Sequence, residues 1–118
     1  MTAFVPNASS VGPSVIFTSV AANDSVTFLQ PLSFISTDVN AVNINHPNNT
    51  VLNMTTLMSG AAYGVVVNGV SDCDIINTAT GTIASTAGFL GYVATYMNGD
   101  RNILQNAGAI YSVNGIGG

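Results

Sequence analysis

The sequence predicts an all-β fold, a parallel β-solenoid of about five rungs with three short strands in each rung. Three observations lead to this prediction. A local pattern of an amide and a serine returns along the chain, short β-rich apolar segments are separated by Gly, Asn and Ser turns, and no stretch has a helical period. A β-sandwich would also space its strands closely, but it gives no reason for one pattern to return. The repeat therefore favours the solenoid.

The repeat is defined by four amide side chains, each placed directly after two apolar residues. These amides are 23, 24 and 28 residues apart, and each unit continues through one apolar residue to a serine. The amides are Gln30, Asn53, Asn77 and Gln105. The serines are Ser36, Ser59, Ser85 and Ser112.

The units follow one another as 1–22, 23–47, 48–70, 71–99 and 100–118, within a single domain that spans residues 1–118. We expect 1–22 to be an N-terminal rung or cap and 23–118 to be the repeat rungs. Each later unit opens with turn-forming residues such as Asn48-Asn49. A strand that ends in the amide comes next, then a second strand, and a third is expected at 14–18, 41–45, 64–68 and 92–98.

Equivalent positions of a solenoid stack on one another, which predicts columns of apolar side chains. Adjacent residues of a strand point to opposite faces, so one of the first two columns faces outward or lies at a bend, and the sequence leaves open which one. The amides are expected to stack as a ladder of hydrogen bonds. The three columns are Phe28, Val51, Ile75 and Ile103; Leu29, Leu52, Ile76 and Leu104; and Phe34, Leu57, Ile83 and Ile110.

The composition excludes several classes of function. The chain has a net charge of −4 and a single permanent cation, Arg101, so binding to nucleic acid is not expected. No apolar run is long enough to span a bilayer, and the N-terminus lacks the basic and apolar segments of a secretory signal peptide. Cys73 is the only cysteine and is expected to be a small apolar filler near a turn. No Cys/His set offers a metal site, and we expect no cofactor.

Three segments carry a resemblance to a known group of proteins: G-V-V-V-N-G at 64–69, D-I-I-N-T-A-T-G-T-I-A-S at 74–85, and N-I-L-Q-N-A-G-A-I-Y-S-V-N-G-I-G-G at 102–118. They resemble the degenerate repeats of right-handed β-helices in autotransporter passengers, haemagglutinin-type adhesins and type I-secreted proteins. This resemblance implies the fold and an extracellular or cell-surface setting. It carries no catalytic motif, because adhesins, toxins and polysaccharide-cleaving enzymes share such repeats.

Candidate chemical groups are few. His46 is the only histidine and lies in a turn-like N-H-P-N-N segment, where catalysis is not expected. Asp72 and Asp100 are expected to be vertical neighbours about 5 Å apart in one turn, where capping of backbone groups is the simpler role. Tyr92 and Tyr96 lie around the third strand and offer rings that could stack on sugars. These four residues form the site of an alternative function, binding or cleavage of polysaccharide such as surface glycans.

The two ends of the solenoid carry the leading prediction. A short solenoid exposes a layer of unpaired backbone groups at each end, and natural arrays protect these ends with polar or charged caps. This chain has no lysine and no charged cap at either end, so we expect head-to-tail self-association into a fibre, or a section of an adhesin stalk, with no enzymatic activity. A third possibility is a swapped assembly in which several chains share one core. The expected assembly residues are Phe4, Val5, Val113 and Ile116.

Overall fold

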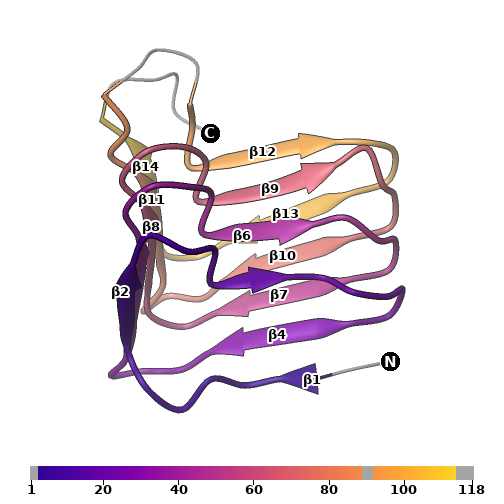
Figure 1. Ribbon diagram of the computed structural model, residues 1–118. Helices are drawn as coiled ribbons and strands as arrows, with labels where there is room; N and C mark the ends of the chain where they lie inside the picture. Colours follow the sequence, from indigo (N-terminus) through magenta and orange to yellow (C-terminus); the bar gives the residue numbers. More distant parts are fainter. Residues whose placement is uncertain (1–2, 89–91, 114–118) are drawn as a thin grey trace.

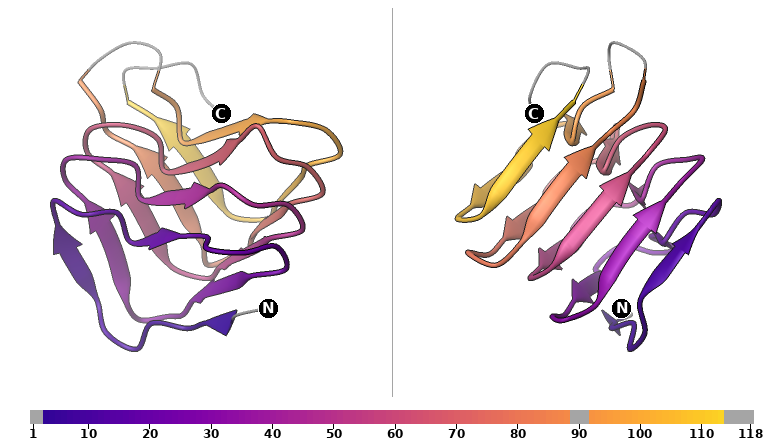
Figure 2. Two further views of the ribbon diagram at one scale, coloured as in Figure 1. Left: turned by 45° about the vertical axis from the view of Figure 1, so that its right-hand side comes forward. Right: turned by 90° about the vertical axis from the view of Figure 1, so that its left-hand side faces the viewer.

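In a computed structural model, which describes residues 3–88 and 92–113, the chain is a parallel β-solenoid (Figure 1). Its strands form three sheets, and successive rungs lie directly above one another (Figure 2). The first sheet contains β1 (Ala3–Phe4), β4 (Ser25–Phe28), β7 (Thr50–Asn53), β10 (Asp74–Asn77) and β13 (Ile103–Asn106). The second contains β2 (Ser10–Gly12), β5 (Ser33–Ser36), β8 (Thr56–Ser59), β11 (Thr82–Ser85) and β14 (Ala109–Ser112). The third contains β3 (Phe17–Thr18), β6 (Val42–Ile44), β9 (Val65–Asn68) and β12 (Thr95–Asn98).

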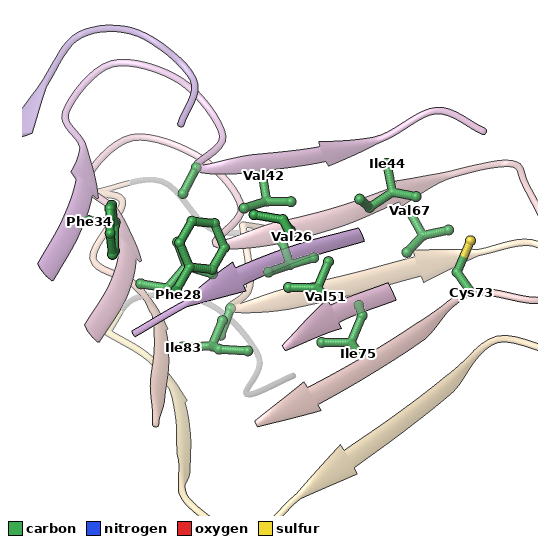
Figure 3. Close-up of a cluster of buried hydrophobic side chains, with 14 residues drawn as sticks. Val26, Phe28, Phe34, Val42, Ile44, Val51, Val67, Cys73, Ile75 and Ile83 are labelled. Carbon is green, nitrogen blue, oxygen red and sulfur yellow. The ribbon is translucent and has the colours of Figure 1, made fainter. Parts of the chain in front are cut away.

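The strands form because side chains alternate between the interior and the outer surface. In β4, β7 and β10 the second and fourth residues are buried and the first and third are half-buried. The inward-facing side chains of all three sheets meet in one apolar core, with Phe34 at one side of the cluster and Cys73 at the other (Figure 3). The rings of Phe28 and Phe34 pack with their centroids 4.9 Å apart. The predicted fold class and the three strands per rung are confirmed. The described residues form about four turns rather than five full rungs, because the first and second sheets have five strands and the third has four.

The inward column of the first sheet differs from both columns expected there. Val26 pairs with Val51, Val51 with Ile75, and Ile75 with Leu104. The predicted placements of Phe28, Leu29, Ile103 and Leu104 in the first two columns are therefore wrong. The two apolar residues before each amide do not occupy the same positions in every strand. Phe28 lies two residues after the position that pairs with Val51, and Ile103 is an outward residue that pairs with Asp74. The outward column is Thr27, Leu52, Ile76 and Gln105.

The second sheet follows the expected register. Its inward apolar column is Phe34, Leu57, Ile83 and Ile110. The serine column occupies the last position of each of these strands, and its hydroxyls bond to the loop of the preceding rung: Ser59 Oγ donates to Val39 O at 2.7 Å, and Ser85 Oγ donates to Ala62 O at 2.6 Å. These carbonyl groups lie outside the strand ladders, and the serine hydroxyl supplies the partner that no strand provides.

One corner of the coil, where the third sheet leads into the first, repeats the same backbone conformation in four rungs. A positive φ occurs at Asn23, Asn48, Asp72 and Arg101. Asn and Asp tolerate this left-handed conformation better than most residues. The next residue of each rung points inward: the Asp24 carboxylate accepts from Val20 N at 3.0 Å, whereas Cys73 is an apolar filler, 1% exposed.

Candidate functional site

The C-terminal end of the solenoid is formed by β12, β13 and β14, each of which is the last strand of its sheet. Each has four residues, and none of the twelve is charged. Within the described part of the chain, each strand is paired along one side only. This end therefore presents a row of backbone groups that a further rung would pair with.

The hydrogen bonds show which residues direct their backbone toward this open edge. Ile103 N donates to Cys73 O and Ala107 N donates to Asn77 O, both at 2.9 Å, so these residues face the preceding rung. In a parallel sheet, successive residues of a strand direct their N–H and C=O groups alternately toward the two neighbouring strands. Leu104 and Asn106 therefore direct their N–H and C=O groups away from β10. In β14 the same reasoning applies to Ile110, because Ala109 N donates to Gly81 O at 3.0 Å.

The N-terminal end has shorter strands and an aromatic cover. β1, β2 and β3 have two, three and two residues. The rings of Phe4 from the first sheet and Phe17 from the third stack with centroids 5.6 Å apart and an interplanar angle of 17°, which closes this end of the core. Phe4 nevertheless keeps 38% of its surface exposed, and Val11 keeps 67%.

The expected assembly residues are only part of the apolar surface at the two ends. Phe4, Val5 and Val113 are exposed, whereas Ile116 lies outside the described residues. Sequence reasoning missed Val11, Ile103 and Tyr111, which are 67%, 52% and 43% exposed. They are outward-facing residues of the terminal strands. The alternation of inward and outward side chains along those strands is the signal that could have identified them.

The amide ladder exists with different members. Asn53 Nδ2 donates to Asn77 Oδ1 at 2.9 Å, and Asn77 Nδ2 donates to Asn106 Oδ1 at 2.8 Å. Gln105 faces outward one residue before Asn106, and Gln30 lies outside the strands, so their predicted places in the ladder are wrong. Phe28 occupies the corresponding position of β4 and ends the ladder on that side.

The ladder also satisfies the loop that follows the first sheet. Asn77 Nδ2 lies 3.2 Å from Gly81 O and 3.1 Å from Ala109 O, and Asn53 Nδ2 donates to Thr55 O at 2.7 Å. A Cβ on Gly81 would lie 2.2 Å from Asn77 Oδ1, so only glycine fits there. Asn53 and Asn77 are almost completely buried, and the structure assigns them a structural role.

The carboxylate pair expected at the corner turn does not form. Asp72 stacks on Arg101, whose Nε and Nη2 donate to the Asp72 carboxylate at 2.7 and 2.9 Å. Asp100 lies one residue earlier in its turn, and its carbonyl accepts from Asp72 N at 3.1 Å. The prediction of Asp72 and Asp100 as stacked carboxylates is wrong because the fourth rung is longer and shifts the turn by one residue. The hydrogen bonds and charge of Arg101 lower the pKa of Asp72 below its ordinary value of 3.8.

This ion pair predicts a small pH dependence of stability. Because the pKa of Asp72 is lowered in the folded protein, its contribution is present above pH 3.8 and is lost as the pH falls through the lower folded value. Both side chains are exposed, so the effect is small and sensitive to salt. Urea unfolding at pH 6 should show wild type slightly more stable than Arg101→Gln, and the difference should be smaller at pH 2. An equal difference at both pH values would contradict this assignment.

Three of the four tyrosines, Tyr63, Tyr92 and Tyr96, form a cluster on the outside of the third sheet. Tyr63 stacks on Tyr96 with centroids 5.1 Å apart, and Tyr92 meets Tyr63 edge-on at 5.1 Å. Beneath them Val66, an outward residue of β9, is only 2% exposed. Tyr92 precedes β12 and Asp100 follows it, so this strand separates the two parts of the proposed polysaccharide site.

The surroundings of His46 and Cys73 indicate structural rather than chemical roles. His46 Nδ1 lies 3.1 Å from Ser19 O and 3.3 Å from Ser19 Oγ. Burial raises the pKa of the Cys73 thiol, which favours the unreactive protonated form. In residues 3–88 and 92–113 no group of three or more His, Cys, Asp or Glu side chains is placed to hold a metal ion. No pocket opens on the described surface.

Comparison with known proteins gives no indication of function. No family model matches the chain, and neither a curated protein nor a solved structure matches it. Over the described residues there is no helix with the length and apolar character that crossing a membrane requires. The ends of the solenoid are therefore the features from which a function can be argued.

Proposed function

We propose that this protein is structural and extracellular: a β-solenoid subunit that stacks head-to-tail into a fibre, or that forms one section of a surface adhesin stalk. The observation that carries the proposal is the pair of uncharged ends. The strands β12, β13 and β14 at one end and β1, β2 and β3 at the other contain no charged residue. Exposed apolar side chains lie at both ends.

Physical chemistry favours covering these ends. Natural edge strands are protected by lysines, inward-pointing charges, bulges or a covering segment. The chain has no lysine, and its one permanent cation, Arg101, is engaged by Asp72 at the corner of the coil. A further rung would pair the backbone groups of Leu104 and Ile110 and bury the partly exposed core of the last rung. Another copy supplies such a rung in a fibre, and flanking repeats supply it in a stalk.

The extracellular setting is supported by the resemblance of residues 64–69, 74–85 and 102–118 to the repeats of secreted β-helices. The solenoid fold agrees with that resemblance at the level of architecture. In such proteins the repeat gives length and stiffness, and a catalytic centre is not required. We accordingly assign no catalytic role to any residue.

Electron microscopy of purified protein over a dilution series tests the fibre. The five strands of the first and second sheets, at a spacing of roughly 4.8 Å, predict a subunit step of about 24 Å. Ile110→Lys should remain folded but form no filaments, because the lysine can reach water at the free end and would be buried in a junction. Ile83→Lys, in the same column but fully buried, should fail to fold. A wild type that stays monomeric at all concentrations, or unchanged filaments of Ile110→Lys, would contradict the fibre.

Binding of polysaccharide is the alternative function, and one observation favours it. Tyr96 is 44% exposed and its ring stacks on that of Tyr63, which gives an aromatic surface on which a sugar ring could stack. The carboxylates expected beside it are at the other end of β12, and Asp72 is occupied by Arg101. The alternative function is therefore limited to binding of polysaccharide, without cleavage, at the aromatic surface formed by Tyr63 and Tyr96.

A further inference from the structure

We propose that a second copy docks on the C-terminal end in the register of the interior rungs, with β1 over β13 and β2 over β14. The described third sheet has one strand fewer than the other two, so in this register β3 lies two strand spacings from β12 and does not pair with it. This inference rests on the proposed head-to-tail assembly and specifies its interface. It differs from a tail-to-tail dimer, in which two C-terminal ends would meet and leave both N-terminal ends exposed. The partner is thus another molecule of this chain, bound through its first rung.

The register follows from positions that the interior rungs share. Phe4 pairs with Val26, whose column continues through Val51 and Ile75 to Leu104. A docking copy that continues this column therefore places its Phe4 on Leu104. Phe17 of the third sheet stacks on Phe4 within the same copy. The docking copy thus places the stacked Phe4 and Phe17 rings over the partly exposed core of the last rung.

The outer face supplies a second set of contacts. In the second sheet Val11 belongs to the column of Ile35, Met58, Ala84 and Tyr111. The same register sets Val11 of the docking copy directly against Tyr111. These two side chains are 67% and 43% exposed in the single chain, so their contact buries apolar surface that is otherwise open to water. An aromatic residue opposite a β-branched one is a favourable cross-strand pair.

The backbone groups of the two ends are complementary in this register. At the C-terminal edge, the inward residues Leu104 and Ile110 direct their N–H and C=O groups outward from the end. At the N-terminal edge the outward residues do so, because Thr50 N donates to Asp24 O at 3.0 Å and Met54 N to Phe28 O at 2.9 Å. The same alternation turns the backbone of Ala3 and Val11 to the free N-terminal edge. In the first and second sheets the junction therefore repeats the hydrogen-bond pattern of an interior rung pair.

The junction also lacks two bonds that interior rungs possess. Pro6 stands two residues after Phe4, at the position of the amide ladder, so it offers no amide oxygen to Asn106. Pro13 follows Gly12, at the position where Thr37 donates its N–H to Gly12 O, and it has no N–H to donate. The contact between copies is accordingly weaker than the contact between rungs of one chain. Filaments should come apart at the junctions on dilution.

Disulfide trapping tests the register. In a Cys73→Ala background, Val11→Cys and Tyr111→Cys are combined in one chain and oxidised. Stacked positions lie about 4.8 Å apart, inside the range that a disulfide spans, whereas Val11 and Ala109 of the next copy would be roughly 8 Å apart. Val11→Cys with Tyr111→Cys should give a ladder of covalent oligomers at least about tenfold faster than the matched pair Val11→Cys with Ala109→Cys.

The other outcomes are distinct. Equal rates for the two cysteine pairs, in a protein that forms filaments, would overturn the register and leave head-to-tail assembly standing. Rapid dimerisation of the single variant Tyr111→Cys, without longer oligomers, would show a tail-to-tail contact and overturn the proposal. If the unmodified chain forms no filaments by electron microscopy and neither pair is trapped, both the register and the fibre are rejected.

Discussion

Ile75→Asp prevents folding, whereas Ile76→Asp, one residue further along β10, leaves the solenoid folded. Ile75 is 0% exposed and belongs to the apolar core, and Ile76 belongs to the outward column. Loss of a buried isoleucine costs about 2–5 kcal/mol, and burial of an unpaired carboxylate adds several more. This total reaches the entire stability of a typical domain, about 5–15 kcal/mol.

Far-UV circular dichroism and urea unfolding of the two variants measure this difference. The pair is well matched, because the same substitution is made at neighbouring isoleucines of one strand. We expect Ile76→Asp to lose about 1–2 kcal/mol, since its side chain is half-buried. Two variants of equal stability would show that the inward and outward columns of the first sheet are assigned wrongly.

Asn77→Leu is expected to destabilise the protein by about 3–5 kcal/mol, a large effect for a residue with no catalytic role. Asn77 is 1% exposed, and its amide donates to the carbonyl groups of Gly81 and Ala109 and to Asn106. Leucine fills a similar volume but leaves these acceptors unpaired. The Gly81 carbonyl and the Asn53 amide, both in buried residues, then lose a partner in a place where water does not replace it.

The control for this substitution is a second amide pair on the outer surface. Asn68 Nδ2 donates to Asn45 Oδ1 at 2.7 Å, but both residues are exposed. Asn68→Leu should therefore cost less than about 1 kcal/mol, because water satisfies the groups that it leaves. Urea midpoints of the two variants decide the matter. Similar losses of stability in Asn77→Leu and Asn68→Leu would mean that burial does not determine how much an amide pair contributes to the stability of the fold.

Much of the fold could be predicted from the sequence because the repeat marks equivalent positions. The column from Phe34 to Ile110 and the serines that follow it were aligned correctly, since one apolar residue and one serine stand at fixed positions in each strand. The resemblance to secreted β-helices led to the same architecture. Turn residues with positive φ, such as Asn23 and Asn48, also fell where the rungs were expected to begin.

The register of the first sheet was harder to predict for a physical reason. Its outward positions include Leu52 and Ile76, which are as apolar as the inward Val51 and Ile75. Hydrophobicity alone then does not distinguish the two faces, and the apolar pair before each amide was aligned one residue off in the last rung. The ion pair between Asp72 and Arg101 was missed with it, because the turn before β13 shifts by the same amount.

That ambiguity gives the buried amides a consequence for folding specificity. A strand of the first sheet that slipped by one residue would exchange one isoleucine for another at little hydrophobic cost. The same slip would carry Asn77 out of line with Asn53 and Asn106 and abandon the bonds between them. A buried polar group that accepts only one alignment discriminates against the incorrect pairing even where it adds little net stability. The ladder thus acts as a check on register in the one sheet whose apolar pattern does not provide it.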